Sequence, residues 1–253
     1  MNVFSDYARY YDLLYKDKDY AAEATFVLDQ LKMDGLSPAS VLELGCGTGR
    51  HAMEFARLGC QPTGIDLSEQ MVTLARERTA SAGTAGLEFE VGDVRRWRGG
   101  RKFAAVVSLF HVMSYQTSNE DLQAAIETAG AHLDPGGSFL FDFWFGPAVL
   151  SDPPAVRVKR MEDNVIKATR LAEPATNCAD STVTVSYEVL VENKQTGSIS
   201  RLNEQHRMRY LFLPELEVLL NAGGFTLTAS GCWMNCAPVS KDCWYAWVIG
   251  QKR

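Results

Sequence analysis

A branched apolar run that leads into three alternating glycines is the feature that most limits the fold of this chain. Val41-Leu42-Glu43-Leu44 has the composition of a buried strand, and Gly45-Cys46-Gly47-Thr48-Gly49 follows directly. Glycine has no Cβ and tolerates positive φ, so such a loop lets the backbone approach a ligand closely. Residues 50–58 then have a helical pattern, which would place the ligand at a helix N-terminus. This strand, loop and helix predict an α/β fold with a small-molecule site.

The charges around the loop narrow the class of ligand. Asp66 ends a second apolar segment about 20 residues further on, where dinucleotide-type folds place a ribose-binding carboxylate. Nicotinamide and flavin sites use G-x-G-x-x-G, whereas this loop reads G-x-G-x-G. Glu43, two positions before the first glycine, would repel a pyrophosphate but suits a ligand that carries an ammonium or a sulfonium. S-adenosylmethionine has that charge pattern.

The run from Glu43 to Gly49 resembles the first motif of the class I S-adenosylmethionine-dependent methyltransferases. Three more stretches follow in that family's order: residues 64–68, 87–94 and 133–141. The resemblance implies that Asp66 binds the ribose hydroxyls, that Asp93 accepts from the adenine amino group, and that the Val94 N–H contacts a ring nitrogen. It also implies further cofactor contacts, at Tyr15, Glu43, Gly45, Cys46, Gly47, Arg50, Leu67, Met71, Leu109 and Phe110.

The order of elements predicts a Rossmann-like, doubly wound parallel sheet with an antiparallel insert after the fifth strand. Five strands alternate with helices, near residues 40–44, 61–65, 87–91, 103–109 and 138–144. After Asp152-Pro153-Pro154 the pattern changes to period two, with strands over 165–171, 182–191 and 198–212, and a helix over 214–221 precedes strands over 225–230 and 243–251. We therefore expect an aromatic arm and helix over residues 1–39, a cofactor-binding core over 40–150, an insert over 151–212 and a return to the core over 213–253.

The N-terminal residues resemble a narrower group within this family. Tyr11-Asp12-Leu13-Leu14-Tyr15 and residues 18–24 look like the opening of bacterial N-methyltransferases that act on nucleotide-linked 3-amino sugars, and residues 107–115 match the same group. The resemblance implies an amine acceptor, a role in antibiotic biosynthesis, and a homo-oligomer formed through the insert. Residues 203–210 also recur in related small-molecule methyltransferases of antibiotic pathways, so the acceptor class stays open.

Four side chains are candidates for the chemistry. The resemblance places a tyrosine at the position of Tyr11 close to the transferring methyl, and a polar aromatic at Tyr115 near the acceptor nitrogen. His111 follows the fourth strand, at the carboxyl ends where open α/β sheets bind ligands. His206 lies on a predicted strand of the insert, on one face with Glu204, while arginines 207 and 209 lie on the other. Asp142, Phe143 and Trp144 are further candidates on the acceptor side.

Methyl transfer from a sulfonium is an in-line displacement in which the enzyme mostly aligns and desolvates the reactants. We expect an amine acceptor. The alternative is an O-methyltransferase with His111 or His206 as general base, since a hydroxyl needs one. A binding module that keeps the nucleoside pocket without turnover is a third interpretation.

Composition excludes several other classes. The net charge is −6 with a pI near 5.3, which disfavours nucleic acid as a partner. A basic cluster over residues 95–102 is interpreted as a solvated turn. We find no apolar run of membrane-spanning length and no signal-peptide pattern, and therefore expect a cytoplasmic enzyme. The six cysteines lack a metal-ligand spacing, so we expect reduced thiols and no metal.

Overall fold

The structure is a computed structural model that describes Tyr10, residues 13–83, 86–235 and 237–253. Tyr11 lies outside these residues. The chain divides into two compact units. The core unit comprises Tyr20–Asp152 and Arg209–Arg253, and the insert unit comprises Pro153–Met208 together with the described residues before Tyr20.

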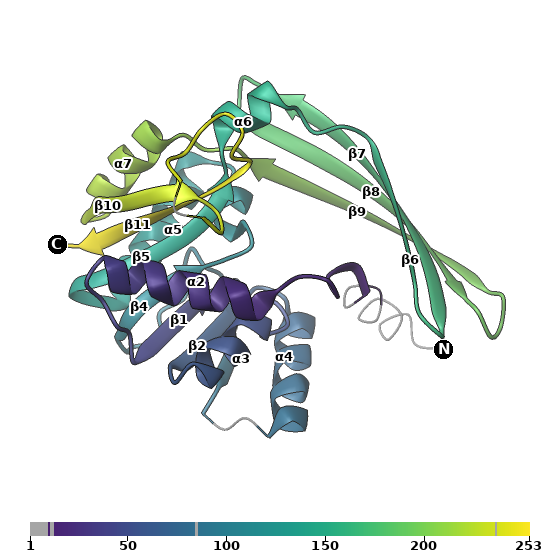
Figure 1. Ribbon diagram of the computed structural model, residues 1–253, viewed down its shortest axis with the longest axis horizontal. Coiled ribbons are helices and arrows are strands. Elements are labelled where there is room, and N and C mark those ends of the chain that lie inside the picture. Colours follow the sequence, from purple (N-terminus) through teal and green to yellow (C-terminus); the bar gives the residue numbers. More distant parts are fainter. Residues whose placement is uncertain (1–9, 11–12, 84–85, 236) are drawn as a thin grey trace. The chain divides into compact units, whose positions relative to one another are not determined.

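A seven-stranded sheet forms the centre of the core unit (Figure 1). Its strands stand in the order β10-β11-β5-β4-β1-β2-β3, and β1 to β5 run parallel while β11 pairs antiparallel to β5 and to β10. The predicted doubly wound parallel sheet is thereby confirmed. The bounds are β1 Ser40–Leu44, β2 Gln61–Asp66, β3 Glu88–Val91, β4 Phe103–Ser108, β5 Leu133–Trp144, β10 Phe225–Cys232 and β11 Tyr245–Lys252.

Helices cover both faces of this sheet (Figure 1). On one face, Val41 and Val107 pack with α2 (Tyr20–Met33) and α3 (Arg50–Arg57), and α4 (Glu69–Ala82) lies beside α3. On the other face, Leu42 and Val106 pack with α5 (Asn119–Ala131) and α7 (Leu213–Ala222). Side chains of a strand alternate between its two faces, so each apolar strand contributes to the hydrophobic core on either side of the sheet. The fold is completed by the short helices η1 (Val112–Tyr115) and α6 (Gly146–Ser151).

The insert is a separate antiparallel sheet with the strand order β6-β7-β8-β9. The strands are β6 Arg157–Glu162, β7 Ile166–Asn177, β8 Thr182–Asn193 and β9 Ile199–Arg209. The expected antiparallel insert is therefore present. We did not predict β6, because five of its six residues are exposed and it has no alternating apolar pattern. Apolar side chains on one face of the sheet pack with Leu13 and Leu14 of the aromatic arm.

Two local expectations were wrong. We expected the fifth strand near residues 138–144, but β5 begins at Leu133 and includes Gly136, whose φ of +85° is a local irregularity in the strand. We also predicted reduced thiols near the C-terminus, but Cys232 and Cys243 form a disulfide with a Cα–Cα distance of 5.6 Å. These cysteines come together because β10 and β11 are antiparallel neighbours in the sheet. The spacing of the cysteines in the sequence did not reveal this strand pairing.

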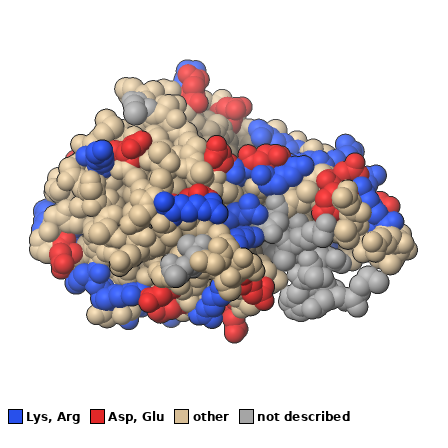
Figure 2. Space-filling view, turned by 60° about the horizontal axis from the view of Figure 1, so that its bottom comes forward, with Lys and Arg blue, Asp and Glu red and all other residues tan. Residues whose placement is uncertain are grey.

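The basic segment after β3 connects parts of the core. Arg98 donates to Thr128 Oγ1, Arg101 contacts Thr63 and Glu88, and Lys102 donates to the carbonyls of residues 131 and 133. Figure 2 shows acidic and basic side chains intermixed on the face it presents. In the described part of the chain, no helix combines the length and apolar character that crossing a membrane requires.

Candidate active site

The glycine loop after β1 is held against β2 and against the segment that follows β4. Gly45, Gly47 and Gly49 all have positive φ, at 79°, 52° and 73°. The N–H groups of Gly45 and Cys46 both donate to the Ile65 carbonyl at 2.8 Å. A Cβ on Gly45 would lie 2.5 Å from a methyl of Val112, so the loop passes closer to this segment than any other residue would allow. The loop backbone thus lies close to Val112, while its predicted approach to a ligand stays a prediction.

Asp66 connects the glycine loop to the end of β2. Its Oδ2 accepts the N–H of Gly47 and its Oδ1 accepts the N–H of Ser68, both at 2.9 Å. Ser68 in turn caps α4 by accepting the N–H of Met71. Leu67, between them, is 69% exposed, an unusual position for a leucine and one suited to cover a ring of a bound nucleoside. The cofactor roles of Asp66, Leu67 and Met71 stay predictions.

Asp93 has a partner that the sequence did not reveal. Arg95 contacts both of its carboxylate oxygens, at 2.8–3.2 Å, and also reaches Asp121 at 2.8 Å. This hydrogen-bonded arginine is the largest cause that lowers the pKa of Asp93. An adenine amino group at Asp93 would therefore share this carboxylate with Arg95. The neighbouring Val94 is buried. The two charged side chains are only two residues apart, and we had placed Arg95 in a solvated turn.

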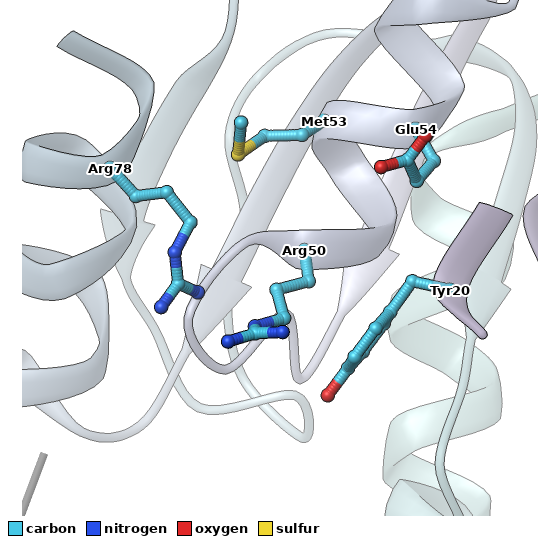
Figure 3. A pocket seen from close by; sticks show the side chains of 5 residues that line it. All are labelled: Tyr20, Arg50, Met53, Glu54 and Arg78. Atoms are coloured by element: carbon cyan, nitrogen blue, oxygen red, sulfur yellow. The ribbon is translucent and has the colours of Figure 1, made fainter. Parts of the chain in front are cut away.

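A hollow of about 220 Å³ lies at the first turn of α3, lined by Tyr20, Arg50, Met53, Glu54 and Arg78. In Figure 3 the Arg50 side chain lies between Arg78, which comes from α4, and Tyr20, which begins α2. The guanidinium of Arg50 is 5.2 Å from the Tyr20 ring centroid, and Arg78 donates to the carbonyl and the hydroxyl of Thr48 in the glycine loop. Two guanidiniums beside this loop make the hollow suitable for an anionic group.

His111 and Asp142 are paired at the carboxyl ends of β4 and β5. His111 Nδ1 lies 2.6 Å from Asp142 Oδ2, and the His111 backbone N–H also donates to this carboxylate. The Nδ1 contact is short, but the ring is not aligned for a regular hydrogen bond. Phe110 and His111 both have left-handed backbones, with φ of 64° and 66°. Two such non-glycine residues in succession are costly, a kind of strain that is concentrated at functional sites.

Aromatic side chains surround this pair. The Tyr245 ring stacks on His111 at 4.5 Å, and the Trp144 ring is 6.4 Å from it. Trp144 Nε1 is buried and has no hydrogen-bond partner among the described residues, so its N–H can serve a ligand. Tyr115 is 44% exposed in the segment that follows His111. Of the other candidates, Leu109 is buried, and Phe143 lies fully within the core, away from any acceptor.

In the insert unit, a polar cluster occupies one face of the sheet. His206 Nε2 is 3.5 Å from Glu204, and its ring meets the Tyr187 ring edge-on at 5.2 Å. The Arg170 guanidinium lies 4.8 Å from the Tyr187 centroid and hydrogen-bonds with Tyr10 and Tyr15. Burial is the largest cause that raises the pKa of Tyr15, and it raises the pKa of Tyr10 to about 12.

The predicted alternation along β9 is confirmed, since His206 and Glu204 are half-buried while Gln205 and Arg207 are exposed. Arg207 pairs with Asp180, and Arg209 pairs with Glu215. Both arginines of this face are therefore engaged with carboxylates of the chain itself. The cofactor role of Tyr15 and the catalytic role of His206 stay predictions.

Comparisons with known proteins agree with this geometry. A family profile described as a methyltransferase domain matches residues 41–137. A dTDP-3-amino-3,4,6-trideoxy-alpha-D-glucopyranose N,N-dimethyltransferase of Streptomyces venezuelae is 39% identical over 149 residues, which are 58% of this chain and 61% of the relative. A dTDP-3-amino-3,6-dideoxy-alpha-D-glucopyranose N,N-dimethyltransferase of Streptomyces fradiae is 28% identical over 222 residues, 87% of this chain and 84% of the relative.

A solved structure gives the same fold over nearly the whole length. The S-adenosylmethionine-dependent methyltransferase of Clostridium acetobutylicum superposes with a TM-score of 0.83 at 20% identity, covering 99% of each chain. The profile lies over the glycine loop, Asp66 and Asp93, which are the residues on which the cofactor assignment rests. Residues 41–137 thus match a methyltransferase-domain profile, the fold is that of an S-adenosylmethionine-dependent methyltransferase of known structure, and the sequence resembles enzymes that N,N-dimethylate dTDP-linked amino sugars.

Proposed function

We propose that this protein transfers a methyl group from S-adenosylmethionine to the amine nitrogen of a small molecule, with a nucleotide-linked amino sugar as the acceptor. The observation that carries the proposal is the His111–Asp142 pair, set in an aromatic surround beside the glycine loop. The two dTDP-amino-sugar N,N-dimethyltransferases among the relatives support the acceptor class.

The cofactor, when bound, supplies an activated methyl group, and the chain supplies position and a proton acceptor. Asp66 and Leu67 would hold the adenosine part, and Asp93 would meet the adenine edge. An amine that gains a methyl group must also lose a proton. His111 is suited to accept it at Nε2, because the Tyr245 ring stacks on the imidazole and the bond from the His111 backbone N–H to Asp142 fixes the residue at the ends of β4 and β5. The indole N–H of Trp144 and the Tyr115 hydroxyl are the groups we assign to acceptor contacts.

Arg50 is assigned to the carboxylate of the cofactor's methionine part. It begins α3 directly after the glycine loop, with Tyr20 and Arg78 beside it (Figure 3). We expect Arg50→Ala to weaken S-adenosylmethionine binding about tenfold, since a charge-assisted hydrogen bond contributes roughly 1.5–3 kcal/mol. Isothermal titration measures this. Arg57→Ala is the matched control, because Arg57 ends the same helix in an exposed pair with Glu54; equal losses in both variants would contradict the assignment.

A hydroxyl acceptor is the second candidate, because the His111–Asp142 pair would also serve as a general base for an alcohol. The test is transfer from isotopically labelled S-adenosylmethionine into a panel of dTDP-amino sugars, free amines and the matching hydroxy sugars, read by mass. We expect one or two methyl groups on a sugar nitrogen. Label only on a hydroxyl would replace the N-methyl assignment, and label on amines other than sugars would remove the sugar.

We also infer a homo-oligomer formed through the insert sheet and a cytoplasmic location. The support is the resemblance of the chain to bacterial enzymes of small-molecule biosynthesis and its acidic composition. Light scattering coupled to size exclusion tests the first inference: we expect a particle of at least twice 28.0 kDa. A monomer at micromolar concentration would contradict it.

A further inference from the structure

A buried cluster of three ionisable side chains lies on the α2 and α3 side of the glycine loop. His51 Nε2 is 2.8 Å from Glu23 Oε2, and His51 Nδ1 is 3.4 Å from Glu43 Oε1. Glu23 comes from α2, Glu43 from β1 and His51 from α3, and all three are at most 8% exposed. His51 is not among the candidate site residues named from the sequence. Because His51 lies between two carboxylates and beside the loop proposed to bind a cationic cofactor, its charge can affect cofactor binding.

The charges of the cluster do not balance within it. One imidazolium faces two carboxylates, and the shorter contact goes to Glu23. Glu43 Oε2 is buried and has no hydrogen-bond partner among the described residues. A buried carboxylate oxygen without a partner is costly. Glu43 is therefore the carboxylate that a cation in the adjacent loop would stabilise.

The pKa shifts agree with this division of charge. Burial, the largest cause, raises the pKa of Glu43, and the charge of Asp66 adds to the rise. The hydrogen bond and charge of His51 and a backbone hydrogen bond from Ala52 lower this pKa but do not outweigh burial. The pKa of His51 is raised as well: burial opposes its charge, but the hydrogen bonds with Glu23 and Glu43 outweigh burial. Glu23 thus keeps His51 charged and also draws that charge away from Glu43.

We propose that Glu23 and His51 are positioning residues that keep the Glu43 carboxylate incompletely neutralised, so that the loop prefers the cationic S-adenosylmethionine to the uncharged S-adenosylhomocysteine. S-adenosylmethionine carries a sulfonium, an ammonium and a carboxylate, for a net charge of +1. S-adenosylhomocysteine lacks the sulfonium and is neutral overall. The cluster thereby weakens product binding relative to substrate binding. This inference rests on the proposed cofactor but not on the acceptor.

The experiment compares the two dissociation constants in Glu23→Gln. With Glu23 uncharged, His51 is free to neutralise Glu43, and the preference for S-adenosylmethionine should fall about tenfold, the effect of one charge at roughly 10 Å in a medium of effective dielectric constant about 20. Glu23→Asp keeps the charge and should restore most of the preference. Asp29→Asn, on the exposed side of the same helix, is the matched control and should change neither constant.

A purely structural role would weaken both ligands equally and leave their ratio unchanged, which would overturn the proposal. Absence of binding by either ligand in the unaltered protein would instead contradict the proposed function.

A second measurement needs no variant. The groups that face His51 are Tyr20 and Glu23 of α2 and Glu43 of β1. As the pH rises through the raised pKa of His51, its positive charge is lost and Glu43 is less neutralised. At pH values below the titration of either ligand's amino group, the ratio of the two dissociation constants should therefore shift further toward S-adenosylmethionine with rising pH. A ratio independent of pH would overturn the proposal.

Discussion

Replacing His111 by asparagine is expected to lower kcat for amine methylation by about 10²–10³-fold while the dissociation constant of S-adenosylmethionine changes little. A positioned general base contributes roughly 10²–10⁴-fold, and asparagine cannot accept the proton that the alkylated amine releases. Single-turnover kinetics with labelled cofactor measure the chemical step directly.

Two further variants locate the effect at His111. Asp142→Asn should lower kcat by about 10–100-fold, because the ring keeps its place on Tyr245 but loses the carboxylate beside Nδ1. His206→Asn is the matched control, since His206 is the other histidine we considered as a base. A large loss in His206→Asn together with near-normal turnover in His111→Asn would move the base to the insert. Near-normal turnover in both would show that proton removal by histidine is not required.

The cofactor half of the site could be predicted because its signals are local. The glycine loop follows β1 directly, Glu43 lies near the end of β1 and Asp66 ends β2, and parallel strands place their carboxyl ends at one edge of the sheet. The fold class was predictable for the same reason: continuous apolar strands that alternate with helices have one common arrangement. Such inferences do not depend on contacts between residues that are far apart in the sequence.

The parts that could not be predicted depend on distant pairs. Asp142 is 31 residues from His111, and Glu23 is 28 residues from His51, so neither partner is visible in a local pattern. The charges on β6 concealed that strand, because an edge strand with exposed side chains lacks the alternation by which strands are recognised. The left-handed backbone at Phe110 and His111 also gave no signal, since only a few per cent of non-glycine residues adopt it and neither side chain identifies such a position by itself.

A methyl group added to Gly45 is expected to abolish cofactor binding at concentrations that saturate the unaltered protein, a loss of at least about 100-fold. Its φ of +79° costs an alanine roughly 1–2 kcal/mol, and the new Cβ would overlap Val112 at 2.5 Å. Overpacking of this kind typically costs a further 1–3 kcal/mol. The free energy of unfolding should therefore fall by about 2–5 kcal/mol, measured by urea denaturation, and the displaced loop should lose its contact with the cofactor.

Gly59→Ala separates strain from overlap. Gly59 has φ +91°, and nothing lies within 4 Å of its Cβ position, so alanine there should cost only the roughly 1–2 kcal/mol of backbone strain and leave cofactor binding intact. Adding Val112→Ala to Gly45→Ala removes the overlapping methyls and should recover the overpacking part of the loss. The coupling between the two positions, read from a double-mutant cycle, measures the close approach of loop and η1. If Gly45→Ala and Gly59→Ala lose equal stability, and the cycle shows no coupling, backbone strain alone explains the glycine at position 45.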